Sequence, residues 1–517
     1  MPPRHLSPFA LTVSGVRTAR GTHRDMGEPL SKDTAAPEAR TTLVALGWNY
    51  ASAIAATVLQ LCYTAYTARV VLPESFGAFA AAAAATTVLG YVAGAGLATY
   101  LLRAEELTRQ TVRCAYRVSM LSGVLCCAVS QAVAPLAAAV WGLPEVAPMV
   151  QLYGVYFLTQ PASQVAVAAL RRLDQARFCA VTETVAQFAG MVVGAGLLGL
   201  GWSPYGLVVA QVMTPSVTLA VAAVWLARLP LADGPHVPPR EMLRISGAFA
   251  GYGMIQMTAA DVTLLAVTRF LGPAAAGQFS RTTLAVGLPV AVLCQSLRRA
   301  VMPSLARING GGRRLGTVLP DVLSATSAVA FATFGVLAGV GPAALALLLG
   351  PGWEAAGALV PVLAAGAPLV LLCQVSYAAD EIRREMGSLL QTQLLVLAAT
   401  VVFVGLAVVA GQGMALVAVA ASVAAGVGHL EQLVRWHRTG LCHMSAIVRP
   451  YAVHAAVGAA LYGSGYLAAG YGNGPLARVA HGLLGMVPVA LVCVVLRRRL
   501  PLYAAAVSRG LITGRAG

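Results

Sequence analysis

Two charged side chains, Asp261 and Arg281, interrupt otherwise apolar stretches of the sequence, where charges are costly and usually functional. Each lies about seven to nine residues from the short segment that joins the two stretches, so both sit roughly 10–13 Å along their helices. A guanidinium stays ionised when buried and makes paired contacts with phosphate. The two residues can therefore bind an anionic ligand, with the carboxylate as exchange partner, or form a fixed ion pair between neighbouring helices.

Uncharged polar side chains add to these candidates. Asn49 and Gln60 lie in the first apolar stretch, and Gln256 lies just before Asp261. An amide can donate and accept hydrogen bonds, so each could line a polar path or join two helices. Further amides lie in the apolar stretches at Gln160, Gln164, Gln187, Gln211 and Gln374. Trp353 and the tyrosine pairs Tyr63/Tyr66 and Tyr153/Tyr156 fit the aromatic belts of a membrane interface.

The composition excludes most other kinds of chemistry. Of 517 residues, 58% are hydrophobic and 10% are charged, whereas soluble domains contain about 45–50% apolar and about 25% charged residues. This excludes a soluble enzyme, a nucleic-acid-binding module and a disulfide-rich secreted domain. The nine cysteines lie mostly in apolar stretches without metal-ligand spacing. We therefore expect no metal, no cofactor and no catalytic residue.

The apolar stretches predict an all-α, polytopic membrane protein with about fourteen transmembrane helices. The expected spans are 41–68, 76–102, 114–140, 147–170, 179–200, 203–227, 245–270, 274–298, 319–349, 356–379, 388–410, 413–434, 450–470 and 479–496. If the N-terminus is cytoplasmic, 31 of the 35 Lys and Arg residues fall on the cytoplasmic side and 3 on the external side, and the remaining one, Arg281, lies within a span. Such a bias sets orientation, so we expect both termini in the cytoplasm of a multi-pass cell-membrane protein.

A repeated motif predicts how these spans are arranged. The pattern R-x3-P-x3-G-x-F follows the first span and recurs after the seventh. Its residues are Arg69, Pro73, Gly77 and Phe79 in one copy and Arg269, Pro273, Gly277 and Phe279 in the other. Six spans separate the copies, so the halves share one orientation and form a parallel repeat. We interpret both motifs as structural elbows, because proline and glycine shape a tight turn.

The repeat divides the chain into two six-helix bundles around a central cavity, followed by two additional helices. The expected parts are a disordered cytoplasmic tail (1–40), the first bundle (41–228), a cytoplasmic linker (229–244), the second bundle (245–434), two further transmembrane helices (435–496) and a basic cytoplasmic tail (497–517). The Asp261/Arg281 pair has no charged counterpart at the equivalent first-half positions, Leu61 and Ala81.

Four segments resemble polysaccharide transporters of the Wzx type, from the multidrug/oligosaccharidyl-lipid/polysaccharide (MATE-like) exporter superfamily. They are residues 68–77, 261–281, 301–307 and 349–353. The resemblance implies two bundles around a cavity and a flippase that moves undecaprenyl-diphosphate-linked oligosaccharide, a precursor of lipopolysaccharide or exopolysaccharide, by alternating access. In that setting Arg281 would engage the diphosphate.

The resemblance also implies partners and leaves alternatives. Membrane lipids surround the protein, glycosyltransferases and a polymerase of the same pathway are expected partners, and proton or sodium coupling is open. A cation-coupled multidrug antiporter of the same superfamily would also have two bundles. A non-transporting scaffold of a glycan-assembly complex is the alternative from another class.

Overall fold

The computed structural model describes residues 32–94, 96–104, 106–235, 238–308, 312–383, 385–411 and 413–496. This part of the chain consists of helices and short connections, with no strand. The helices are α1 (Lys32–Val70), α2 (Pro73–Gly94), α3 (Leu97–Arg103), α4 (Arg109–Trp141), α5 (Val146–Arg172), α6 (Ala176–Gly199), α7 (Tyr205–Arg228), α8 (Pro239–Leu271), α9 (Pro273–Ile308), α10 (Gly312–Leu349), α11 (Glu354–Ile382), α12 (Met386–Val409), α13 (Gly413–Arg438), α14 (Ser445–Ala469) and α15 (Pro475–Val495).

Every predicted span coincides with a long helix except the second. The sequence predicts one continuous helix over 76–102, but the structure divides it into α2 and α3. The division falls at Gly96, whose φ of 66° is left-handed and suits a residue without a side chain. Helix α1 begins at Lys32, before the expected start at residue 41, and residues 1–31 and 497–517 of the predicted tails lie outside the described residues.

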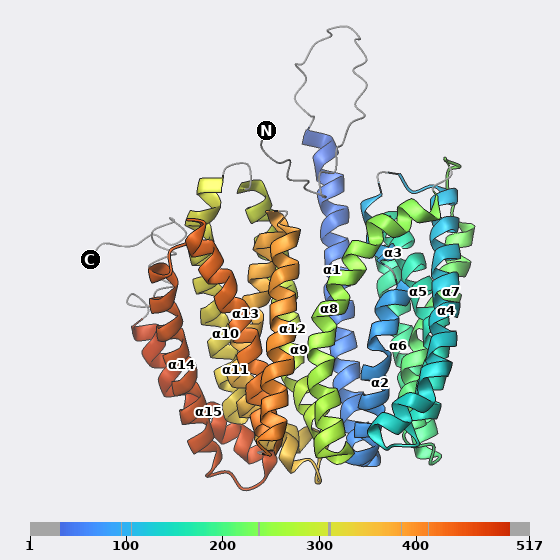
Figure 1. The fold of residues 1–517 in the computed structure, drawn as a ribbon. Helices are drawn as coiled ribbons and strands as arrows, with labels where there is room; N and C mark the ends of the chain where they lie inside the picture. Colours follow the sequence, from blue (N-terminus) through green and yellow to red (C-terminus); the bar gives the residue numbers. More distant parts are fainter. Residues whose placement is uncertain are drawn as a thin grey trace, which may run out of the picture. The chain divides into compact units, whose positions relative to one another are not determined.

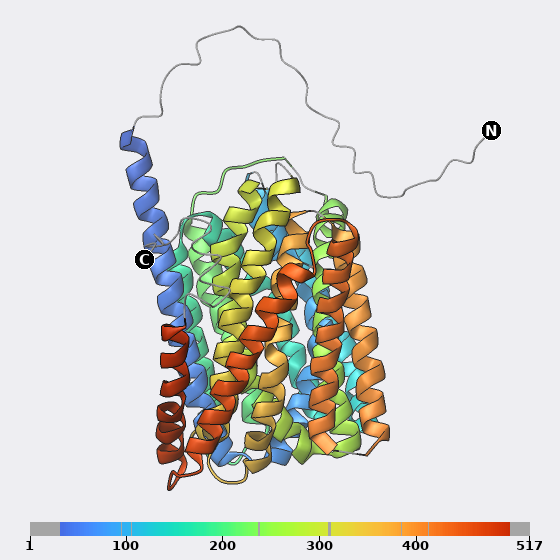
Figure 2. The ribbon, with the colours of Figure 1, turned by 90° about the vertical axis from the view of Figure 1, so that its left-hand side faces the viewer.

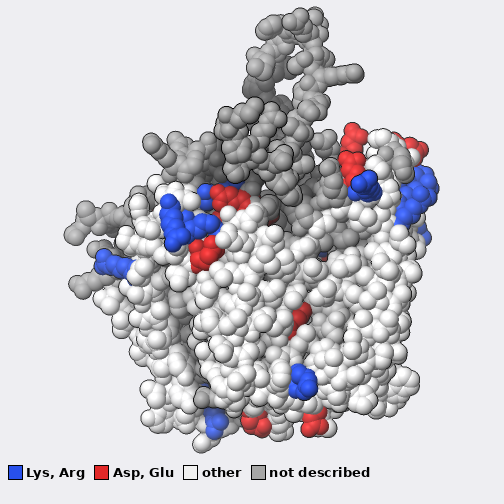
Figure 3. Space-filling view, in the orientation of Figure 1, with Lys and Arg blue, Asp and Glu red and all other residues white. Residues whose placement is uncertain are grey.

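The surface fits a protein that crosses a membrane several times. Within the described residues, nine helical segments are long and apolar enough to span a membrane. Figure 3 shows Lys, Arg, Asp and Glu gathered towards the two ends of the helices, with a broad, mostly uncharged band between them. The chain is therefore an all-α, multi-pass membrane protein of the predicted class.

The packing repeats in two halves, which we call the first half (α1–α7) and the second half (α8–α13). In the first half α5 packs against α2, α4 and α7, and in the second α11 packs in the same way against α9, α10 and α13. Helices α14 and α15 pack against each other and against α10 (Figure 1; Figure 2). The repeat expected from the motifs is thus present in the helix packing.

Contacts between the halves centre on α2, which packs against α8 and α9. Helices α2 and α9 each begin at a proline, after turns of two residues from the end of α1 and one residue from the end of α8, and a missing N–H costs nothing at this first helical position. We call the end of the helices with these two turns the elbow end. The opposite end, which contains the connection between α7 and α8, is the linker end.

Candidate functional site

A cavity of about 860 Å³ lies between the two halves. It is lined by side chains from α1, α2, α5, α6 and α7 of the first half and from α8 and α9 of the second. Its polar lining includes Gln60, Tyr63, Gln187, Gln211, Asp261 and Arg281. The structure therefore brings three of the residues predicted from sequence, Gln60, Asp261 and Arg281, into one site.

Arg281 is the positive charge of this cavity. Its side chain is only 9% exposed, and its Nε has no hydrogen-bond partner among the described residues. The guanidinium carbon lies 4.2 Å from the centre of the Phe76 ring, which is a cation–π distance. The buried hydroxyl of Tyr63, which lines the cavity from α1 of the first half, also lacks a partner within the described chain. A buried cation with an unused donor is suited to an anionic ligand.

Asp261 lines the same cavity without pairing to Arg281. Within the described residues no ion pair joins the two side chains, and Oδ2 of Asp261 has no hydrogen-bond partner. The Thr87 hydroxyl of α2, which donates to the Ala83 carbonyl oxygen at 3.1 Å, lines the same cavity. The fixed bridge that the sequence leaves open is therefore not formed in this conformation, although the two charges do share a cavity.

The remaining polar candidates are less well placed. The Gln60 amide donates to Thr64 of its own helix at 3.5 Å, so the cavity-facing group has only a weak partner. Asn49 lies on α1 and Gln256 on α8, but their side chains are outside the described residues.

The elbow motifs contact each other directly. A Cβ atom at Gly77 would overlap the carbonyl oxygen of Pro273, and a Cβ at Gly277 would overlap that of Pro73. The glycines are thus needed for close approach of the two halves, beyond the turn-shaping role that the motif suggests. Arg69 also reaches the other half, because its Nη2 donates to the Leu347 carbonyl oxygen at 3.2 Å.

Phe76, which lies between Pro73 and Gly77 in the first elbow motif, adds an aromatic contact between the halves. Its ring meets Trp353 edge to face, with the centroids 5.4 Å apart, and the Trp353 indole N–H donates to the Ala68 carbonyl at 2.9 Å. Trp353 is 3% exposed, so its assignment to an interfacial belt is wrong. Because Phe76 and Ala68 belong to the first half and Trp353 to the second, these contacts close the elbow end.

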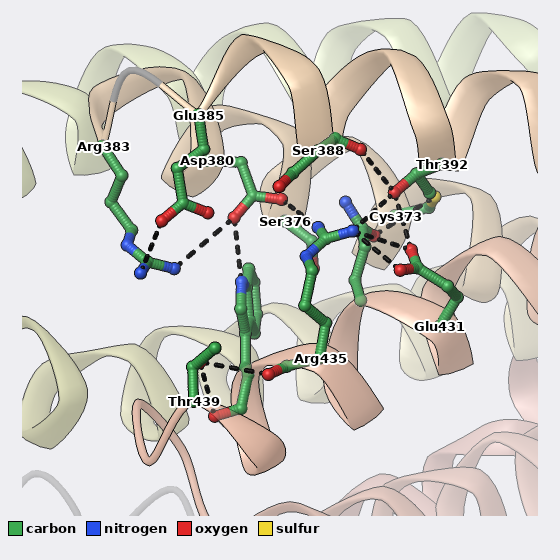
Figure 4. A network of polar contacts seen from close by, with 12 residues as sticks. Cys373, Ser376, Asp380, Arg383, Glu385, Ser388, Thr392, Glu431, Arg435 and Thr439 are labelled. Atoms are coloured by element: carbon green, nitrogen blue, oxygen red, sulfur yellow. Dashed lines mark hydrogen bonds and ion pairs between the residues drawn. The ribbon is translucent and has the colours of Figure 1, made fainter. Parts of the chain in front are cut away.

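A second charged cluster lies at the linker end of the second half and was not predicted from the sequence. Asp380 is fully buried and accepts hydrogen bonds from Arg435 at 2.6 Å and from the Trp436 indole at 2.8 Å (Figure 4). Arg435 also pairs with Glu431 at 2.8 Å. Asp380 and Glu431 neutralise Arg435, so the cluster ties α11 to α13 as a structural bridge, although Nε of Arg435 has no hydrogen-bond partner among the described residues. The one available signal was an acid at the end of an apolar span.

Comparisons with known proteins agree with this architecture. The family described as "Polysaccharide biosynthesis protein" matches residues 67–358. The succinoglycan biosynthesis transport protein ExoT of Rhizobium meliloti (strain 1021) is 22% identical over 336 residues, or 65% of this chain and 68% of ExoT.

Two solved structures share the fold at low identity. A lipid II flippase, MurJ, in an inward closed conformation superposes with a TM-score of 0.69 at 12% identity, covering 88% of this chain and 99% of that one. An inward-facing multidrug resistance MATE family transporter of the MOP superfamily gives a TM-score of 0.56 at 15% identity, over 76% of this chain and 96% of that one.

Proposed function

The chain belongs to the polysaccharide biosynthesis protein family, and from this premise we propose that it flips an undecaprenyl-diphosphate-linked oligosaccharide across the cytoplasmic membrane. The transport protein ExoT and the lipid II flippase structure support a flippase on this fold. The observation that carries the proposal is Arg281, a buried and incompletely bonded cation in a cavity that both halves line.

Alternating access requires a cavity that is closed at one end and reached from the other. The Gly77/Pro273 contact and the Phe76–Trp353 pair close the elbow end. Under the orientation expected from the arginine distribution, this end faces outside, and the cavity loads from the cytoplasm. Rocking the halves apart at the elbows would then release the head group on the other side.

Arg281 supplies the attraction for the diphosphate. In a low-dielectric cavity a guanidinium binds phosphate oxygens through charge-assisted, paired hydrogen bonds. Its Nε donor is free to take part, since no described residue accepts from it. Asp261 in the same cavity would repel the diphosphate and favour its release once the halves move. Arg281 would then alternate between two anionic partners, the diphosphate and Asp261.

The test uses purified full-length protein in liposomes and a fluorescent undecaprenyl-diphosphate oligosaccharide. Arg281→Ala should lower flipping by about 10- to 150-fold, because hydrogen bonds to charged groups contribute about 1.5–3 kcal/mol. Arg281→Lys should retain only part of the flipping activity, since an ammonium group cannot form two parallel hydrogen bonds with a phosphate. Arg269, the exposed arginine of the second elbow, provides the matched control, and Arg269→Ala should flip normally.

The double variant Asp261→Leu with Arg281→Ala copies the first half and separates the two interpretations. A structural bridge predicts that removing both charges restores folding and transport, because neither is left unpaired. The proposed function predicts a folded but inactive protein. Normal flipping by the double variant would refute the role of Arg281, and export of cationic drugs without lipid flipping would identify a multidrug antiporter.

A further inference from the structure

One face of α5 forms a polar wall along the cavity. Tyr153, Tyr156, Gln160, Gln164 and Arg171 follow one another at spacings of three, four, four and seven residues. These spacings return to the same side of a helix with 3.6 residues per turn. The face therefore presents hydrogen-bonding groups from near the elbow end to the linker end, with the apolar Val167 and Ala168 between Gln164 and Arg171.

This face lines more than the central cavity. Gln160 contributes to the central cavity of about 860 Å³ and to two others, of about 460 Å³ and 370 Å³. The first of these also contains Tyr91, Thr99 and Gln211, and the second reaches the Arg171–Glu183 pair. Because the three spaces share lining residues, they form adjoining compartments along one wall of the first half.

The amides on this wall are not used to join helices. No hydrogen bond links the side chains of Gln160 or Gln164 to another described residue, and Gln164 is exposed. Gln211 is held in place because its Oε1 accepts from the Tyr153 hydroxyl at 2.5 Å, while its NH₂ group stays available. An unpaired amide in a membrane protein is costly unless it faces water or a polar ligand.

The chemistry of the wall indicates a neutral ligand. Within the described residues no charged side chain lines the 460 Å³ cavity. At the linker end Arg171 and Glu183 pair at 2.8 Å and largely cancel each other's charge. Amides can both donate to and accept from a hydroxyl, and phenol rings add apolar faces with a polar edge. This combination fits a hydroxyl-rich, uncharged group.

The equivalent helix of the second half, α11, directs its polar groups elsewhere. Its Gln374 and Tyr377 line a separate cavity of about 240 Å³, which Arg281 does not line. In the central cavity Arg281 contributes the cation from the second half, and Gln160 and Gln211 contribute neutral amides from the first. An amphiphile with a diphosphate next to a sugar presents the same two chemistries side by side.

We infer that the α5 face of the first half, centred on Gln160 and Gln164, is the saccharide subsite, taking neutral sugar residues while Arg281 takes the diphosphate. The inference rests on the proposed function, because it assigns the second part of the same ligand. Sugar hydroxyls would satisfy the two open amides. The site would then select for the presence of a sugar on the lipid diphosphate.

Binding of two defined probes to full-length protein in nanodiscs separates this inference from the proposed function. The probes are bare undecaprenyl diphosphate and undecaprenyl diphosphate carrying one glucose or one galactose. We expect the wild type to bind the sugar-bearing probe more tightly. In Gln160→Leu with Gln164→Leu this advantage should fall by about five- to tenfold, the loss of one or two hydrogen bonds. Affinity for the bare probe should stay within about twofold.

Gln131→Leu is the matched control. Gln131 donates to the Gln151 backbone at 2.9 Å and lines none of these cavities, so its loss should leave the sugar advantage unchanged. If the double variant does not fold, Gln164→Met alone tests the same point, because this side chain is exposed.

Each outcome of the comparison is decisive. A sugar advantage in the wild type that the amide variants lose, while Gln131→Leu keeps it, supports the subsite. No sugar advantage in the wild type, or an equal loss for both probes in the variants, overturns it and leaves the diphosphate role of Arg281 standing. Failure of the wild type to bind either probe overturns the proposed function, and the subsite with it.

Discussion

Substituting Gly77 by alanine should open the elbow end. A Cβ at this position would overlap the Pro273 carbonyl oxygen of the other half. The clash is with backbone, so no side-chain rotation relieves it, but moving the two elbows apart does. Alanine is otherwise favourable within a helix. The strain therefore acts on the contact between the halves and leaves the fold of each half intact.

The size of the effect follows from the cost of overpacking, about 1–3 kcal/mol. This free energy shifts an equilibrium between closed and open elbows by about 5- to 150-fold towards the open form. A conformation that is rare in the wild type becomes substantially populated. Gly277→Ala should act in the same direction, because its Cβ would overlap the Pro73 carbonyl oxygen.

Double electron–electron resonance, which measures the distance between two spin labels, can detect this shift. Leu72 and Phe270 are 68% and 63% exposed and flank the two elbows, so they accept spin labels without disturbing packing. The nine native cysteines require labels introduced as unnatural amino acids. Gly77→Ala in nanodiscs without substrate should add a population at longer distance.

The matched control is Gly90→Ala on the same helix, where a Cβ would make an ordinary 3.8 Å contact with Phe157. It should leave the distance distribution as in the wild type. If Gly77→Ala folds and its distribution also matches the wild type, the close approach of the elbows does not hold this end closed, and the reasoning is refuted.

Two further predictions concern topology and the elbow prolines. Reporter fusions at Gly201 and Gly411 should read as external and one at Gly234 as cytoplasmic; one inverted reading would contradict the fourteen-span arrangement. Pro73→Ala and Pro273→Ala should destabilise the fold by about 0.4–1 kcal/mol and so lower the amount of folded protein in the membrane. Transport per folded molecule should change less, and normal abundance with abolished transport would show that these prolines do more than shape the turns.

The spans were predictable because each depends on a local property, the length of an apolar stretch. The break between α2 and α3 was harder to foresee, since membrane helices tolerate glycine and only the backbone shows that Gly96 adopts a left-handed conformation. The repeat of the elbow motifs is visible in the sequence itself. Their contact across the halves depends on how two segments about 200 residues apart approach each other, and spacing within each copy carries no such information.

The sequence predicts the depth of the candidate site residues in the bundle but not their contacts. The distance of Asp261 and Arg281 along their helices can be counted, and both do line one cavity. Whether they pair depends on the rotation and tilt of α8 and α9, which the count cannot supply. Trp353 was misassigned because a tryptophan near a helix end fits an interface equally well, and its burial comes from the opposite half.

The position of Phe76 links the ligand site to closure of the elbow end. This first-half ring lies against two second-half residues, the Arg281 guanidinium and the Trp353 indole. A cation–π contact contributes about 0.5–2 kcal/mol, and charge-assisted hydrogen bonds to a phosphate contribute about 1.5–3 kcal/mol each. Under the proposed function, a diphosphate can therefore draw Arg281 away from Phe76. A ligand shifts a conformation only through contacts that differ between the two states, and the loss of this contact between the halves on binding is such a difference.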